Sequence, residues 1–378
     1  MEQTFIVMAT ALAFASTRLT AETRGAATTR VCAAAESRFI DPCVGGSWDV
    51  LALSHPGHTF FHSAAWAKVL CRTYRHRPFY LEVAQSGKCV ALLPLMEVNS
   101  RLTGRRAVCL PFSDLCGPLL FDESLPSILE DQLVEFGRAE KWDFIELRGG
   151  VTARDPVPSE PTFYGHRLQL GPNIDDLFSN LDASVRRAVR KAQRSPLTFS
   201  IGDTPELVKA FLRLHAKTRR RHGVPQQSNH FFEMIQKVVL EPGLGFVVQA
   251  SLGPTPVAAA MFFVYGDSAI YKYGASDERF QHHRGNNLVM WEGIKEVKRR
   301  GAQHLHFGRT SCHNHGLRRY KRSWGTKEEP IYYARFDTTR RSWAKIKPDV
   351  AASHEHLFRR MPLVVNRLAG TLLYPHLH

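Results

Sequence analysis

One segment in the last quarter of the chain combines cations with aromatic residues in a way that could position a reacting group. Lys321 lies between Tyr320 and Trp324, so its ammonium is expected beside an apolar wall. The segment follows an apolar stretch that ends near Arg309, and a cation-rich loop at a strand end is a common meeting point for substrate groups. The alternative is a surface loop with a single aromatic anchor.

A stripe of positive charge is expected on a helix in the middle of the chain. Five cations fall within residues 186–194. At about 100° per residue, Arg187, Arg190, Lys191 and Arg194 share roughly one face of that helix. Such a stripe would hold phosphate groups, although charge runs of this kind are usually solvated outer faces.

A second basic cluster ends the following helix. Cations suit a helix C-terminus and Gly223 suits the reversal after it, so capping explains part of the cluster. Three consecutive arginines exceed that need, and Arg221 and His222 are our candidates for reaching a ligand.

A third candidate site is a loop that opens a helix near residue 287. Backbone N–H groups at a helix start and the positive helix end attract an anion, so Asn286 and Asn287 are candidate contacts. The alternative is that one of the two asparagines is simply the N-cap.

The cysteines and histidines do not predict a metal centre. The seven cysteines are scattered and include no Cys-x-x-Cys pair, which favours a reducing compartment over a disulfide framework or a zinc site. The pairs His282-His283 and His313-x-His315 lack helical spacing and an accompanying set of ligands, so we expect no metal.

The overall charge points to an anionic partner. The chain of 378 residues carries a formal net charge of +15. That surplus favours nucleic acid, a phosphorylated substrate or an acidic membrane, with a generally basic surface as the alternative. No run of 18 apolar residues is present, so no single helix is expected to span a bilayer.

Two portions of the chain share one layout. Each contains an apolar hairpin, over residues 79–98 and 246–265, and later a helix followed by a strand. The two copies are separated by a similar length throughout, which suggests duplicated units, although chance similarity of ordinary hairpins is the alternative. The predicted fold class is therefore α/β (α+β), with a mixed β-sheet flanked by helices in each unit.

The repeat and the composition together predict the domain boundaries. Residues 1–37 are expected to be a disordered leader, 38–160 the first domain and 161–337 the second, with a proline-rich linker between them. Two helices are expected at the start of the second domain, over 174–194 and 205–221. Residues 338–378 form a basic amphipathic tail that either lies on an acidic membrane or packs onto the second domain.

An ordered set of segments carries a family resemblance. The segments cover residues 60–66, 92–95, 111–118, 185–192, 218–225, 231–232, 286–291, 307–310 and 320–325. This set resembles the FemAB-like (FemABX-related) acyltransferases of the GNAT superfamily, including the branch associated with exopolysaccharide and exosortase loci. The chain differs from some members in lacking a long helical-hairpin arm.

The resemblance implies tandem GNAT-like domains and transfer of an aminoacyl or acyl group to an amine of a peptidoglycan precursor or an exopolysaccharide. It implies that Lys321 is catalytic, stabilising the developing oxyanion or orienting the donor. Arg309 and the basic helix around Arg190 and Lys191 would hold acidic parts of either substrate. Tyr320 and Trp324 would complete the site.

The donor stays open between acyl-CoA and aminoacyl-tRNA. The expected partners are an anionic small molecule or lipid-linked saccharide, with tRNA and peripheral membrane contact as further candidates. The expected location is the cytoplasm or the inner face of its membrane. The alternative function is an RNA- or polysaccharide-binding protein that has lost catalysis.

Overall fold

The fold consists of two mixed β-sheets flanked by helices, as predicted. The computed structural model describes residues 36–122, 126–149, 161–346 and 355–378. The leader expected over 1–37 lies almost wholly outside these ranges, except that Glu36 and Ser37 begin the first strand. Most of the expected linker also lies outside the described residues.

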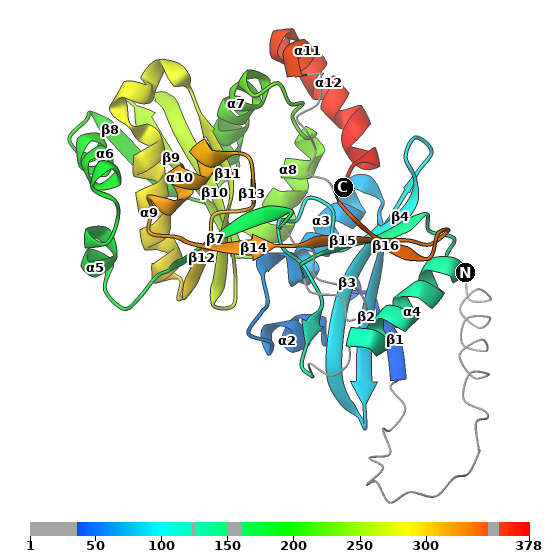
Figure 1. Cartoon of the computed structure of the whole chain (residues 1–378). Coiled ribbons are helices and arrows are strands. Elements are labelled where there is room, and N and C mark those ends of the chain that lie inside the picture. Colours follow the sequence, from blue (N-terminus) through cyan, green and yellow to red (C-terminus); the bar gives the residue numbers. More distant parts are fainter. Residues whose placement is uncertain (1–35, 123–125, 150–160, 347–354) are drawn as a thin grey trace, which may run out of the picture. The chain divides into compact units, whose positions relative to one another are not determined.

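The first sheet combines the N-terminal strands with two strands from the C-terminal part of the chain (Figure 1). Its order is β1 (Glu36–Ile40), β2 (Arg77–Gln85), β3 (Lys88–Ser100), β4 (Gly104–Val108), β6 (Phe144–Arg148), β15 (Tyr333–Asp337) and β16 (Ser342–Lys345), with β5 (Leu119–Leu120) beside β3. Its helices are α2 (Trp48–Leu53), the short η1 (Phe60–His62), α3 (Ala64–Tyr74) and α4 (Pro126–Ala139).

The second sheet is formed by later strands. Its order is β13 (Thr310–Ser311), β7 (Phe163–Gln169), β12 (His304–His306), β11 (Ser268–Ser276), β10 (Thr255–Tyr265), β9 (Gly245–Leu252) and β8 (Leu197–Gly202), with β14 (Lys327–Ile331) beside β7. Its helices are α5 (Ile174–Ser179), α6 (Ala183–Gln193), α7 (Pro205–Arg221), α8 (Asn229–Ile235), η2 (Gln236–Leu240), η3 (Glu278–His283), α9 (Gly285–Arg299) and α10 (His315–Arg322).

The predicted repeat is present in the strand pairing. Hairpins β2–β3 and β9–β10 are both antiparallel. Each is followed by an antiparallel third strand, β4 or β11, that lies parallel to a fourth, β6 or β12. A helix, α4 or α9, makes each parallel connection. The sequence therefore predicted the twinned architecture correctly.

Alternating side chains on the strands build a core shared by the two sheets. On β10, Met261 and Phe263 face a cluster that also contains Trp66 of α3 and Phe231 of α8, whereas Phe262 faces α6 and α9. Because successive strand residues point to opposite faces, each sheet buries both sides. The described residues from Glu36 to His378 consequently form one unit.

The prediction of a single helix over residues 174–194 is wrong. The segment 174–194 forms two helices, α5 and α6, instead of one. Asp182 starts the second helix by accepting a hydrogen bond from the Ser184 amide, and an N-cap residue lies outside helical geometry. The apolar spacing continues across the break because Leu181 is buried, which is why periodicity alone missed it.

A buried ion cluster joins the two sheets. Asp114, in the loop after β4, accepts a hydrogen bond of 3.1 Å from the ammonium of Lys272 on β11, and its side chain lies 3.9 Å from Arg309. The side chain of Lys272 is only 9% exposed. Burial alone would raise the pKa of Asp114, but Lys272 and Arg309 outweigh it and hold the pKa at about 2.

The C-terminal residues form a strand, two helices and a terminal turn. After β16, which pairs with β15, the described tail consists of α11 (Glu355–Arg360), α12 (Leu363–Leu373) and η4 (Tyr374–His376). The helices contact α7, and η4 contacts β3. The expected tail is thus attached to both halves of the unit.

We predict that Asp114→Asn destabilises the protein by about 3 kcal/mol, because it leaves Lys272 buried without its counter-charge. Glu329→Gln, which breaks the exposed pair with Arg167, should cost less than about 1 kcal/mol. Chemical denaturation measures both. Equal losses in the two variants would contradict a structural role for the buried pair.

The same contribution should depend on pH. The folded pKa of Asp114 lies below its ordinary value of 3.8, so the stabilisation is present above about pH 4 and is lost as the pH falls towards 2. The difference in unfolding free energy between the wild type and Asp114→Asn should therefore narrow over that interval.

Candidate active site

A cavity of about 460 Å³ lies where β11 meets the start of α9. We call it the β11–α9 cavity. Its polar and aromatic lining comes from α7, β11, η3, α9 and α10 and from residues that adjoin them. Its lining residues include Arg221, His222, Ser276, Arg284, Asn286, Asn287 and Tyr320.

The start of α9 faces this cavity without a side-chain cap. Arg284 is the N-cap residue and makes no capping hydrogen bond. By contrast, Ser63, Thr204 and Ser228 cap α3, α7 and α8 with their hydroxyl groups. The uncapped amides and the positive end of a helix form a site suited to an anion.

The backbone at Arg284 is held in a left-handed conformation, with φ of 62°. A non-glycine residue in that region costs of order 1 kcal/mol, so the surrounding structure must impose it. The two asparagines lie inside the first turn of α9, and Asn286 donates a hydrogen bond to Ser276. The alternative that Asn286 or Asn287 is the N-cap is therefore wrong.

A β-bulge on β11 follows Tyr271, which lines the cavity. On β10, Met261 pairs with Tyr273 and Phe262 pairs with Tyr271, so Lys272 has no partner in the register. The extra residue bends β11, and the ammonium of Lys272 bonds to the carbonyl of Phe112 as well as to Asp114. Burial lowers the pKa of Lys272, and Asp114 opposes that shift.

The bulge and the ion cluster thus connect the cavity wall to the first sheet. Tyr271 precedes the bulge and lines the cavity, with its hydroxyl over the backbone of Gly274. A side chain at Gly274 would meet that hydroxyl, which explains the glycine at this position. The loop containing Asp114 therefore influences the shape of the cavity through Lys272.

The predicted catalytic residue Lys321 is buried and does not itself line the β11–α9 cavity. Its ammonium donates hydrogen bonds to the carbonyls of Gly308 (2.9 Å) and Arg309 (3.1 Å). Burial lowers the pKa of Lys321 to about 8, although Asp114 favours the charged form. The neighbouring Tyr320 lines the cavity and is 38% exposed.

Arg309 is partly exposed, whereas Trp324 is buried, and neither lines the β11–α9 cavity. The guanidinium of Arg309 donates a hydrogen bond of 2.8 Å to the hydroxyl of Tyr333 and lies 4.2 Å from the centroid of the Phe163 ring. Trp324 is fully buried in the core beside α9. These two predicted substrate-binding residues therefore contact protein groups in this structure.

A second, basic cavity of about 550 Å³ lies against α6, and we call it the α6 cavity. Arg187, Arg190 and Lys191 line it together with His282 and His283. The residues on either side of this histidine pair, Gln281 and Arg284, line the β11–α9 cavity. The end of η3 and Arg284 therefore border both cavities.

The structure brings together most of the predicted site. Arg221, His222, Asn286, Asn287 and Tyr320 share one cavity, and the three cations of α6 share the adjoining one. Sequence reasoning assigned no role to Lys272 or to Asp114. A lysine in the middle of an apolar strand was the available signal for Lys272, since such a side chain requires a buried counter-charge.

Among the described residues, no three histidine, cysteine, aspartate or glutamate side chains are grouped as they would be around a metal ion. In the same part of the chain, no helix combines the length and apolar character needed to cross a bilayer.

A family model described as an acetyltransferase (GNAT) domain matches residues 179–322. This range contains the β11–α9 cavity, the α6 cavity and Lys321. A search of curated proteins finds no match.

Solved structures share the tandem fold. The crystal structure of FemX is 17% identical with a TM-score of 0.62, over 78% of this chain and 95% of that one. A conserved protein of unknown function from Bacteroides thetaiotaomicron is 11% identical with a TM-score of 0.54, over 79% and 98%.

A tandem GNAT protein from the clavulanic acid biosynthesis pathway is also 11% identical, with a TM-score of 0.51, over 81% of this chain and 99% of that one. These likenesses show the fold, and the matched domain gives its chemistry. The chain is an acyltransferase with a FemX-like tandem GNAT fold, as the sequence resemblance predicted.

Proposed function

We propose that the protein transfers an acyl or aminoacyl group from an anionic activated donor in the β11–α9 cavity to an amine of a cell-wall or exopolysaccharide precursor. The observation that carries this proposal is the uncapped start of α9, which opens into that cavity. Phosphate groups of the donor would accept hydrogen bonds from the first turn of α9.

The charges around the cavity support a donor with several phosphates. Arg221 and Arg284 line the β11–α9 cavity. The neighbouring His282 and His283 of η3 line the α6 cavity. A long donor could therefore place its reactive end beside Tyr320 and its phosphate-rich end near Arg190. Acyl-CoA is the donor we favour, because the matched domain is of the GNAT type, and aminoacyl-tRNA is the competing donor.

In the proposed reaction, the amine nitrogen attacks the donor carbonyl, the bond from that carbonyl to the thioester sulfur or the ribose oxygen breaks, and the proton lost by the amine passes to the leaving group. Two protons of the Lys321 ammonium are engaged by the carbonyls of Gly308 and Arg309. Its third proton would stabilise the negative charge that develops on the carbonyl oxygen. The Asp114 carboxylate favours the charged form of Lys321 and so supports this role.

The choice of a cell-envelope precursor as the acceptor rests on the resemblance of the sequence to FemAB-like enzymes. Incubation of the purified protein with each labelled donor and candidate amines would test the assignment. Product from acyl-CoA alone would support our preferred donor. Turnover with neither donor would favour the competing proposal, a polyanion-binding protein, for which the cations of the α6 cavity are the supporting observation.

We predict that Asn287→Asp weakens donor binding at least tenfold, because a carboxylate in the first turn of α9 repels the donor phosphates. The same change should leave the folded protein as stable or slightly more stable, since acids favour a helix start. Calorimetric titration with acyl-CoA and thermal unfolding measure the two effects.

The matched control is Asn229→Asp, which adds an acid to the first turn of α8. Asn229 is exposed and does not line the β11–α9 cavity. Similar loss of donor affinity in both variants would argue against a donor site at the start of α9.

We predict that turnover falls above about pH 8, because Lys321 then loses the proton that serves the oxyanion. Lys321→Met should lower kcat at least about 100-fold. Lys321→Arg retains a positive charge at higher pH and should move the alkaline fall upward in any residual activity. A Lys321→Met enzyme that stays active with an unchanged pH profile would exclude the proposed role.

A further inference from the structure

The helix α12 has its faces reversed relative to an ordinary surface helix. Its side towards the protein is polar or small, with Asn366 only 1% exposed and Gly370 buried. Its outer side is apolar, and Val364, Leu368 and Leu372 are 77%, 59% and 62% exposed. At about 100° per residue these three side chains share one stripe, whereas surface helices normally turn such a stripe inward.

The inward face of α12 is fixed by specific contacts. The side-chain oxygen of Asn366 accepts a hydrogen bond of 3.1 Å from the Gln226 amide. Gly370 lies so close to the Gln226 backbone that a Cβ there would be 1.7 Å from its carbonyl oxygen. Tyr374 donates to the Pro225 carbonyl and accepts from Arg219. The helix therefore cannot rotate to bury its apolar stripe without breaking these contacts.

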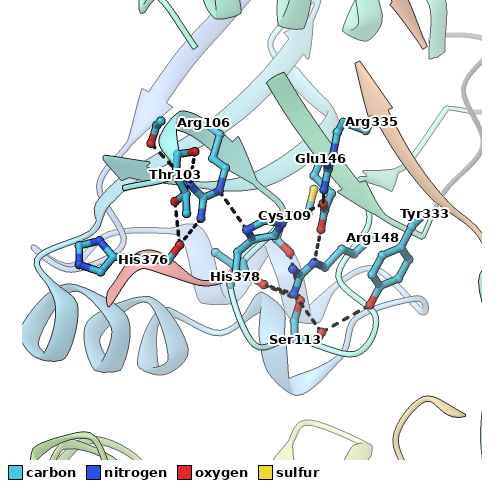
Figure 2. A network of polar contacts seen from close by, with 12 residues as sticks. Thr103, Arg106, Cys109, Ser113, Glu146, Arg148, Tyr333, Arg335, His376 and His378 are labelled. Atoms are coloured by element: carbon cyan, nitrogen blue, oxygen red, sulfur yellow. Dashed lines mark hydrogen bonds and ion pairs between the residues drawn. The ribbon is translucent and has the colours of Figure 1, made fainter. Parts of the chain in front are cut away.

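The residues after α12 are anchored equally well, on the first sheet. Figure 2 shows Arg106 donating hydrogen bonds to the His376 carbonyl (2.6 Å) and to the His378 ring (2.9 Å). The other nitrogen of the His378 ring lies 3.1 Å from Glu146, which also pairs with Arg148 and Arg335. The apolar stripe is thus presented outward from a helix whose far end is firmly held.

Positive charge accompanies the stripe. Arg359 and Arg360 end the preceding helix α11 and are both exposed. Arg359 and Leu363 line a cavity of about 720 Å³ together with the exposed Arg220 of α7, and Lys217 in the same cavity is paired with Asp277. An apolar stripe with flanking cations matches the surface of a bilayer that contains anionic lipids, where apolar side chains enter the acyl boundary and arginines meet headgroup phosphates.

We propose that α11 and α12 dock the protein onto an anionic lipid bilayer. The stripe of Val364, Leu368 and Leu372 enters the interface, and Arg359 and Arg360 bind the headgroups. The cavity beside α11 shares Arg221, Ser276 and Asp277 with the β11–α9 cavity. Docking therefore places the candidate active site at the level of the headgroups, within reach of an acceptor held in the membrane.

Co-sedimentation of the full chain with vesicles tests this proposal without relying on catalysis. We expect binding to phosphatidylcholine vesicles that contain phosphatidylglycerol and much weaker binding to phosphatidylcholine alone. Leu368→Ser/Leu372→Ser should weaken binding by at least about tenfold. Arg359→Gln/Arg360→Gln should weaken it by about fivefold for each arginine, only with the anionic vesicles.

The matched control is Val44→Ser/Val50→Ser, which removes two exposed apolar side chains (84% and 72%) elsewhere on the surface and should bind as the wild type does. Because all of the substituted leucines and valines are exposed, each variant should retain the wild-type unfolding temperature. A wild type that stays in solution with anionic vesicles would overturn the proposal, and so would equal loss of binding in the control.

A second copy of the chain is the competing occupant of the stripe. Light scattering across a range of concentrations would detect it as a dimer that Leu368→Ser/Leu372→Ser dissociates. A dimer of this kind, together with no binding to vesicles, would overturn the membrane proposal and assign the stripe to a subunit interface.

Discussion

The Asp114 carboxylate, between Lys272 and Arg309, is the interaction on which the site most depends. It joins the loop after β4 to the bulge on β11, and therefore couples the first sheet to the wall of the β11–α9 cavity. A buried carboxylate is stable only with compensating charge, and each member of this group would be costly without the others. The same carboxylate favours the protonated form of Lys321.

Duplication explains how a chain of this kind builds such a junction. Each half supplies a hairpin and a parallel strand pair, and α3, α7 and α8 fill the space between the two sheets. A shared apolar core holds the two sheets against each other. The ion cluster adds a specific charged contact between them. The candidate site lies on the second sheet, while one of its supports comes from the first.

The uncapped start of α9 and the reversed faces of α12 share one physical logic. In both cases the chain presents a group without a protein partner: helix amides at Arg284 and an apolar stripe around Leu368. Both features are held by surrounding contacts that prevent relaxation. Each of these surfaces is unfavourable in water. An external ligand, phosphate in one case and lipid in the other, would compensate for it.

The sequence by itself determined the local elements and their repetition. Proline, threonine and apolar spacing placed α7 at 205–221, and apolar runs on either side of a glycine turn placed both hairpins, because these signals arise within a few residues of each other. The cations of α6 and the residues of the β11–α9 cavity were also recognisable from their types. What only the tertiary structure decided are contacts between residues far apart in the chain: Asp114 with Lys272, Asn366 with Gln226, and β15 with β6. Periodicity identifies which face of a helix or strand is apolar, but it carries no information on which distant segment that face meets. For α12, the spacing predicted an apolar stripe. Only the contacts of Asn366 and Gly370 with Gln226 show that this stripe faces outward.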